Sequence, residues 1–311
     1  MASLPSPGTA SRRARIAITF DFEMVANFPK WDDTHWNYEK GNLTEQVKRY
    51  AVEAARRVRA RGGVVHGFLV GRLLEQENID WLKEMIGNGH SVGNHSYDHV
   101  ALLAKTSAAT QFRFERAPWL VAGRTVGEIL RDNIRLTNEA FQSRLGIRPS
   151  GFRAPGGLRQ GLNERPDLQA MLLELGFTWV STLYPAHPLA AGGAPPTPEM
   201  IAGIQKIGAT VRPFVYPSGL IEVPMSPISD VTAFRSGWQL EHFIESTRQG
   251  VERVIREGGT LDFLSHPAVL ANRDPGFTVI DLICDLVEKA GDRASIVDLA
   301  MIARETSAGR A

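Results

Sequence analysis

Cysteine is nearly absent from this chain, whose 311 residues include a single one, Cys284. One thiol excludes an internal disulfide and any cysteine-rich zinc site. Because Cys284 ends a largely apolar run over residues 279–284, we expect a buried, inert side chain rather than a nucleophile.

The sequence also lacks an excess of charge and a long hydrophobic segment. Its 35 Lys and Arg residues stand against 34 Asp and Glu residues, which gives a formal net charge of +1. That balance argues against a nucleic-acid groove or an electrostatic membrane tether, so we expect no nucleic-acid partner. No run of about 18 apolar residues occurs, so we expect no membrane span. A homo-oligomer stays open.

The first residues do not have the order of a secretory signal. Residues 1–8 are rich in Pro, Ser and Gly, and Arg12, Arg13 and Arg15 follow them. A signal would instead place its basic residues before an apolar segment. We therefore predict a disordered tail over residues 1–14, a single domain over residues 15–305, and a cytoplasmic protein.

Short apolar runs alternate with amphipathic segments along the rest of the chain. This βα rhythm predicts an α/β fold with parallel strands. A Pro-, Gly- and Ala-rich segment over residues 185–203 predicts a loop within the domain. The predicted strands cover residues 15–23, 64–70, 91–94, 150–157, 177–181, 220–224, 259–267 and 294–297, and the predicted helices residues 42–61, 72–87, 125–145, 167–175, 239–256 and 277–290.

Two carboxylates close the first predicted strand. Asp21 and Glu23 are two residues apart, which places them on the same side of an extended chain. Burying two carboxylates is costly without a partner, so the pair is a first indication of a bound cation. The alternative is that both lie beyond the strand, in solvent. The aromatic-rich segment that follows, residues 24–43, predicts a lid or a binding wall, with a packed surface loop as the alternative.

The segment from His90 to His99 places two histidines, His95 and His99, four residues apart. On a helical turn, this spacing puts both imidazoles on one face, where they can reach a single metal ion. Taken alone, the pair is equally well explained as a polar surface pair. Arg153 and His266 also lie at the ends of predicted strands. Since the carboxyl ends of parallel strands gather on one face, we expect these polar groups to meet there.

Four short motifs resemble, in order and spacing, those of the polysaccharide deacetylase family, also called the NodB-homology or carbohydrate esterase 4 group. The resemblance covers residues 15 to 300. It implies a distorted (β/α) barrel with about seven strands, which agrees with the βα rhythm. The motifs are Thr19-Phe20-Asp21, His95-Ser96-Tyr97-Asp98-His99, Arg153-Ala154-Pro155-Gly156-Gly157 and Leu264-Ser265-His266.

The resemblance implies a hydrolase of amide carbon–nitrogen bonds that uses a divalent metal, commonly zinc. In the family one carboxylate and two histidines hold the ion, and His95 and His99 match those histidines. Asp21 matches the base that takes a proton from water, and His266 matches the acid that protonates the leaving amine.

Two further positions take their expected roles from the same resemblance. Arg153 would orient Asp21 and tune it by charge pairing. The backbone N–H of Gly156 would help to hold the oxyanion. The family often has Tyr where this chain has Gly156, so we expect a more open pocket wall.

The chain departs from the family pattern at two other places. The usual first motif has adjacent aspartates, whereas Phe22 follows Asp21 here, so Glu23 is the expected third metal ligand. The motif around Trp179 lacks the Asp that the family provides there. His266 is therefore left without an obvious carboxylate partner, and Asp230 and Asp262 are both open as substitutes.

Three functions follow from these observations. The first is a metal-dependent deacetylase of an N-acetylated sugar or polysaccharide, favoured by the Asp-His-His set. The second is a hydrolase of small amides on the same barrel, resembling the allantoinase and cyclic-imide branch, some of which dispense with metal. The third is an inactive barrel that only binds glycans. The expected partner is accordingly a carbohydrate or a small amide.

Overall fold

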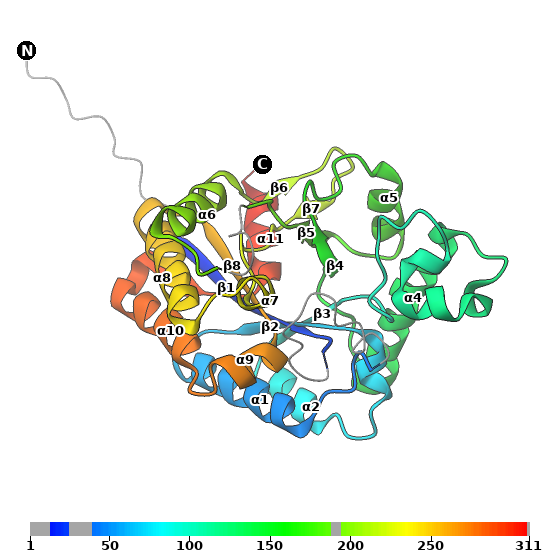
Figure 1. The fold of residues 1–311 in the computed structure, drawn as a ribbon, viewed down its shortest axis with the longest axis horizontal. Coiled ribbons are helices and arrows are strands. Elements are labelled where there is room, and N and C mark those ends of the chain that lie inside the picture. The colour runs from blue at the N-terminus through cyan, green and yellow to red at the C-terminus, as the bar shows by residue number, and fades with distance from the viewer. Residues whose placement is uncertain (1–12, 25–38, 188–193, 310–311) are drawn as a thin grey trace, which may run out of the picture.

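The computed structural model describes residues 13–24, 39–187 and 194–309. Most of the predicted tail over residues 1–14, and of the predicted lid over residues 24–43, lies outside the described residues. The described chain forms a curved sheet with helices packed around it (Figure 1). The predicted distorted (β/α) barrel is therefore confirmed.

Nine strands build the sheet in the described part of the chain, and three of them contain only two or three residues. The order is β6-β7-β5-β4-β3-β2-β1-β8, and β9 pairs with β1. All pairings are parallel except that of β6 with β7. The strands are β1 Ala14–Phe22, β2 Val65–Leu69, β3 Ser91–Asn94, β4 Phe152–Leu158, β5 Trp179–Leu183, β6 Phe214–Val215, β7 Ile221–Glu222, β8 Thr260–Ser265 and β9 Ala294–Ile296.

Helices flank both ends of the sheet in Figure 1, with α4 and α5 on one side and α8 and α10 on the other. None of the helices in the described ranges is long and apolar enough to cross a membrane. The helices are α1 Glu45–Ala60, α2 Asp80–Gly87, α3 Phe112–Arg116, α4 Val126–Leu145, α5 Pro166–Glu174, α6 Pro198–Thr210, α7 Asp230–Arg235, α8 Leu240–Glu257, α9 Pro267–Arg273, α10 Thr278–Ala290 and α11 Leu299–Ala308, with 3₁₀ turns η2 Gly71–Glu75, η3 Ala108–Thr110, η4 Pro118–Val121 and η6 Gly291–Arg293.

One predicted helix and one predicted loop need correction. The helix predicted over residues 72–87 is instead η2 followed by α2, because the backbone turns extended at Gln76 (ψ 138°). The loop predicted over residues 185–203 ends earlier, since α6 begins at Pro198. Thr197 caps that helix by accepting a hydrogen bond from the Met200 N–H, and Pro is well suited to a first helical turn.

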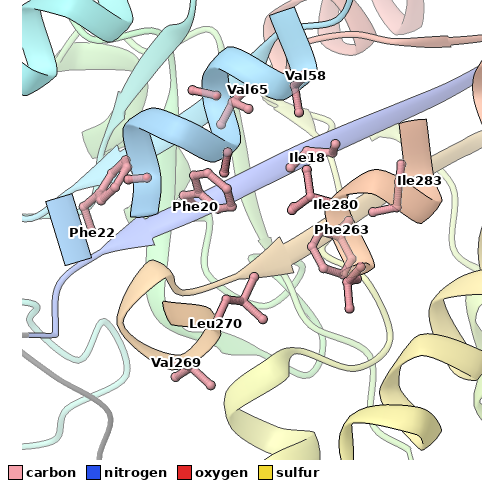
Figure 2. Packing of buried hydrophobic residues seen from close by; sticks show 14 of the residues in the cluster. Ile18, Phe20, Phe22, Val58, Val65, Phe263, Val269, Leu270, Ile280 and Ile283 are labelled. Atoms are coloured by element: carbon pink, nitrogen blue, oxygen red, sulfur yellow. The ribbon is translucent and has the colours of Figure 1, made fainter. Parts of the chain in front are cut away.

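The side chains of β1 alternate between two surroundings. The even-numbered residues 16–22 are apolar and lie in the outer core, where Figure 2 shows Ile18 beside Ile280 of α10. The odd-numbered residues 17–21 point to the opposite face, because successive strand residues alternate sides. That face is the interior of the barrel, so β1 carries Asp21 inward.

An apolar cluster closes the barrel interior beneath the polar residues. Ala17, Phe68 and Trp179 come from three strands, and Leu299 and Ile302 of α11 pack against them. The single cysteine lies elsewhere, in the outer core, and is buried as expected. This end of the interior is therefore mainly apolar, and the polar groups that surround Arg153 lie at the other end.

One polar side chain, His66, is buried inside the barrel and stacks on Phe68, with ring centroids 4.6 Å apart. Burial lowers the pKa of His66 to about 4. In the unfolded chain the pKa is about 6.5, so the neutral ring favours the folded state. This stability is complete above pH 6.5 and is lost progressively as the pH falls towards 4.

We expect His66→Gln, which cannot titrate, to flatten this loss of stability between pH 6.5 and 4. Denaturant unfolding at several pH values measures the slope of the free energy of unfolding. The control is His242→Gln, which removes a half-exposed histidine of α8 and should keep the native slope. An unchanged slope in His66→Gln would contradict the assignment.

Candidate active site

The carboxyl ends of the central strands surround a cavity of about 230 Å³. Asp21 lies in β1 and Glu23 directly after it, while the histidine pair follows β3 and His266 follows β8. Arg153 of β4 is fully buried beneath the cavity. Six of the predicted site residues line the cavity, namely Asp21, Glu23, His95, His99, Gly156 and His266.

The histidine pair converges, but not through a helical turn as predicted. Residues 95–99 have no helical structure, and Ser96 and His99 have φ values of 57° and 60°. These left-handed residues fold the chain back so that the rings of His95 and His99 lie 5.0 Å apart. The Asn94 side chain supports the turn by accepting a hydrogen bond from the Ser96 N–H at 2.7 Å. The four-residue spacing of the histidines therefore does bring their rings together, through a non-helical turn.

Glu23, His95 and His99 form a three-ligand cluster whose ligand atoms all lie within 4.8 Å of one another. Glu23 Oε2 is 3.7 Å from His95 Nε2 and is in direct contact with His99 Nε2. Ligand atoms around a tetrahedral zinc ion would be about 3.4 Å apart, given zinc bonds of about 2.0–2.2 Å. The donor set and the 3.7 Å separation of Glu23 Oε2 from His95 Nε2 therefore fit a zinc-sized cation, whereas Glu23 Oε2 and His99 Nε2 would have to move apart to hold it.

The surroundings prepare these side chains for a cation. His95 Nδ1 lies 3.0 Å from the Arg153 carbonyl oxygen, so Nδ1–H donates and Nε2 keeps its lone pair towards the cavity. Burial lowers the pKa of His99 to about 4, which favours the neutral ring that a metal needs. Burial alone would raise the pKa of Glu23, but His99 and Lys40 hold it well below its usual range.

Arg153 organises a polar layer beneath the cavity. Its Nη1 donates to Asp21 Oδ1 at 3.0 Å and to Thr19 Oγ1 at 2.8 Å. Its Nη2 donates to Asp262 Oδ2, and Thr19 Oγ1 donates to the other Asp262 oxygen at 2.6 Å. Asp262 is thus the partner of Arg153. Because Arg153 is itself held by Asp262, its hydrogen bond to Asp21 fixes the position of that carboxylate.

The open question of the His266 partner has a clear structural answer. His266 Nδ1 lies 2.8 Å from Asp230 Oδ1, and the His266 N–H donates to Asp230 Oδ2 at 2.7 Å. His266 Nε2 faces the cavity, 3.2 Å from Glu23 Oε1. Burial would lower the pKa of His266, but Asp230 and then Glu23 raise it to about 10. Asp230 is the first residue of α7, a helix that the strand and helix pattern did not predict.

Lys40 is a further residue of the site, and no sequence pattern indicates it. Its side chain is fully buried, and its Nζ lies 3.3 Å from Glu23 Oε2. Lys40 belongs to the end of the segment predicted as a lid, and 17 positions separate it from Glu23. No periodicity connects residues at that distance, so only the fold reveals the contact.

Gly156 lies on the cavity wall with a φ of 73°. A Cβ built there would meet no heavy atom within 4 Å, so the position is open on this side. Its neighbour Gly157 differs, since a Cβ there would lie 2.5 Å from the Tyr184 Cβ. The absence of a side chain at Gly156 therefore widens the entrance, whereas Gly157 is required for packing.

The fold is found in proteins of known structure. Three solved structures share the fold: a candidate polysaccharide deacetylase from Mycobacterium smegmatis (16% identity, 100% of this chain and 96% of that one, TM-score 0.62), another from Pseudomonas aeruginosa PAO1 (14%, 94% and 91%, 0.61), and Puue allantoinase (13%, 96% and 92%, 0.63). No curated protein matches the sequence.

The sequence profile described as polysaccharide deacetylase matches residues 10–177, more than half of the chain. That span contains Asp21, Glu23, both cavity histidines and Arg153. The chain therefore belongs to the polysaccharide deacetylase family of amide-hydrolysing enzymes.

Proposed function

We propose that this protein is a divalent-metal-dependent deacetylase, with zinc as the best-fitting ion, acting on an N-acetylated sugar or polysaccharide. One observation carries the proposal: Glu23, His95 and His99 cluster in the same cavity that Asp21 and His266 line. A base, an acid and a ligand set within one small cavity are what metal-assisted amide hydrolysis requires.

Glu23, His95 and His99 would hold the ion. When bound, a divalent metal polarises the amide carbonyl and makes water more acidic. The remaining chemistry falls to the protein. Its side chains must accept one proton, donate another and hold the substrate in place.

Asp21 is placed to accept the proton. One carboxylate oxygen, Oδ1, is held by Arg153, and the other, Oδ2, lies 3.8 Å from His95 Nε2 at the ligand cluster. The arginine prevents the carboxylate from rotating, so Oδ2 stays directed at the reacting water. In this proposal Asp21 is the general base and Arg153 its positioning residue.

His266 is placed on the other side of the cavity to give a proton back. Asp230 accepts the Nδ1–H hydrogen bond and so leaves Nε2 facing the substrate. The adjacent carboxylate favours the protonated ring, the form that can donate to the leaving nitrogen. Gly156 also lines the cavity, and its backbone N–H would stabilise the oxyanion.

Removing a ligand should empty the site. We expect the native protein to retain about one zinc ion per chain after dialysis, and His95→Ala or Glu23→Gln to retain almost none, since a three-ligand site loses a full donor. Metal analysis of the purified proteins measures the stoichiometry.

The matched control is His242→Ala, which removes a histidine on α8 outside the cavity and should keep the native metal content. A native protein without stoichiometric metal, together with full activity in His95→Ala, would show the metal mechanism to be wrong.

A second candidate substrate class is a small cyclic ureide or imide, which a cavity of only about 230 Å³ can enclose. Acetylated chitooligosaccharides and cyclic ureides should therefore be assayed side by side. Release of acetate from the former supports the deacetylase, whereas turnover of the latter alone identifies a small-amide hydrolase. Glycan binding without any turnover would indicate an inactive barrel.

A further inference from the structure

A buried cation touches the predicted metal-ligand carboxylate. The Lys40 ammonium is fully buried and lies 3.3 Å from Glu23 Oε2. Oε2 is also the atom that contacts His99 Nε2 and lies 3.7 Å from His95 Nε2. The oxygen that would bind the metal is therefore the oxygen that Lys40 already neutralises.

The backbone fixes this contact. Gly41, next to Lys40, donates its N–H to the Glu23 carbonyl oxygen at 2.8 Å. Gly41 has a φ of 81°, and a Cβ there would lie 2.5 Å from the Leu73 nitrogen, so only glycine fits. The Lys40 main chain is thus held against the residue whose side chain its ammonium meets, and the pair forms part of the built site.

Lys40 adds charge where Glu23 is already held by other groups. His99 contacts Oε2, and His266 Nε2 lies 3.2 Å from Oε1, so both carboxylate oxygens have partners besides Lys40. The main effect of the ammonium is therefore electrostatic. A monovalent and a divalent cation that share one carboxylate oxygen in a buried site repel each other strongly.

We propose that Lys40 is a fixed counter-cation that acts through Glu23 to limit how tightly the site holds its divalent metal, which keeps the ion exchangeable. This inference rests on the proposed metal-dependent function. The role of Lys40 differs from that of the metal ligands, because loss of a ligand lowers the affinity for the metal. Loss of the Lys40 charge should raise that affinity.

Zinc affinity tests the assignment without any assay of activity. We expect Lys40→Met, which keeps the length of the side chain and removes its charge, to lower the Kd for zinc at least tenfold. The metal should also leave more slowly when a strong chelator is added. Lys40→Arg keeps the charge and should bind zinc within about threefold of the native protein. Competition with a chromogenic chelator gives all three affinities.

Lys48→Met is the matched control, since it removes a lysine of α1 that pairs with Glu45 at 2.8 Å outside the cavity. Its zinc affinity should be native. If Lys40→Met does not fold, Lys40→Gln provides the same loss of charge with a polar side chain. A folded, uncharged variant whose zinc Kd is unchanged or higher overturns the proposal for Lys40 alone. A native protein that binds no zinc overturns the metal-dependent function with it.

Discussion

Asp21→Asn is expected to lower kcat for amide hydrolysis by about a thousandfold, within the range that loss of a general base typically costs. Asparagine has nearly the shape of aspartate and can still accept the hydrogen bond from Arg153, which lies 3.0 Å from Asp21 Oδ1. It cannot accept a proton at the reacting water. The loss should therefore appear in kcat, measured as acetate released from an acetylated chitooligosaccharide.

Metal content distinguishes a lost base from a damaged site. Because Asp21 is not in the three-ligand cluster, Asp21→Asn should keep the native zinc stoichiometry. The matched control is Asp98→Asn, which alters an aspartate of the histidine motif whose carboxylate pairs with Arg113 at 3.3 Å, outside the cavity. That control should be nearly fully active. Activity of Asp21→Asn within tenfold of native would remove Asp21 from the role of base.

The second large effect is expected for Asp230→Asn, which should lower kcat on amides by about a hundredfold to ten-thousandfold. Asparagine has nearly the shape of aspartate, but its single carbonyl oxygen can accept only one of the two hydrogen bonds that the backbone N–H groups of Val231 and His266 donate, at 2.7 Å each, to separate Asp230 oxygens. The charge that holds the proton on His266 is lost. Less of the imidazole is then protonated at neutral pH, so a smaller fraction of the enzyme holds the proton that the leaving amine needs.

The leaving group shows whether proton donation is what was lost. An amine must be protonated as it departs, whereas p-nitrophenolate leaves without help. Asp230→Asn should therefore hydrolyse p-nitrophenyl acetate within about tenfold of native while failing on amides, and Asp21→Asn should fail on both. Equal losses on both substrates in Asp230→Asn would mean that Asp230 supports the site only structurally.

Local patterns were enough to predict the elements whose signals lie within a few residues. The helix predicted over residues 125–145 is α4, with Thr125 and Glu128 forming a capping box and Gly146 ending it at a φ of 67°. The alternation of β1 likewise places Asp21 inside the barrel. Parallel βα order then explains why polar groups from distant strands share one cavity.

Other features depend on contacts that the sequence does not encode locally. The choice between Asp230 and Asp262 depends on their elements, since Asp262 lies within β8 and points into the polar layer, whereas Asp230 begins a separate helix above it. The left-handed conformations of Ser96 and His99 and the burial of Lys40 also depend on tertiary contacts. The sequence therefore indicates which residues are candidates for the site, but not which side chains they contact.

β1 is synthesised first among the strands, but its pairing is completed by strands near the end of the chain. β1 pairs with β2 on one side and with β8 and β9 near the end of the chain on the other. Residues up to His99 include all three side chains of the Glu23, His95 and His99 cluster, so these are synthesised before β8 and β9, which complete the pairing of β1. Asp230 and His266 emerge much later, after most of the barrel has been made. Synthesis of the chain thus supplies the Glu23, His95 and His99 side chains first and the Asp230 and His266 pair last.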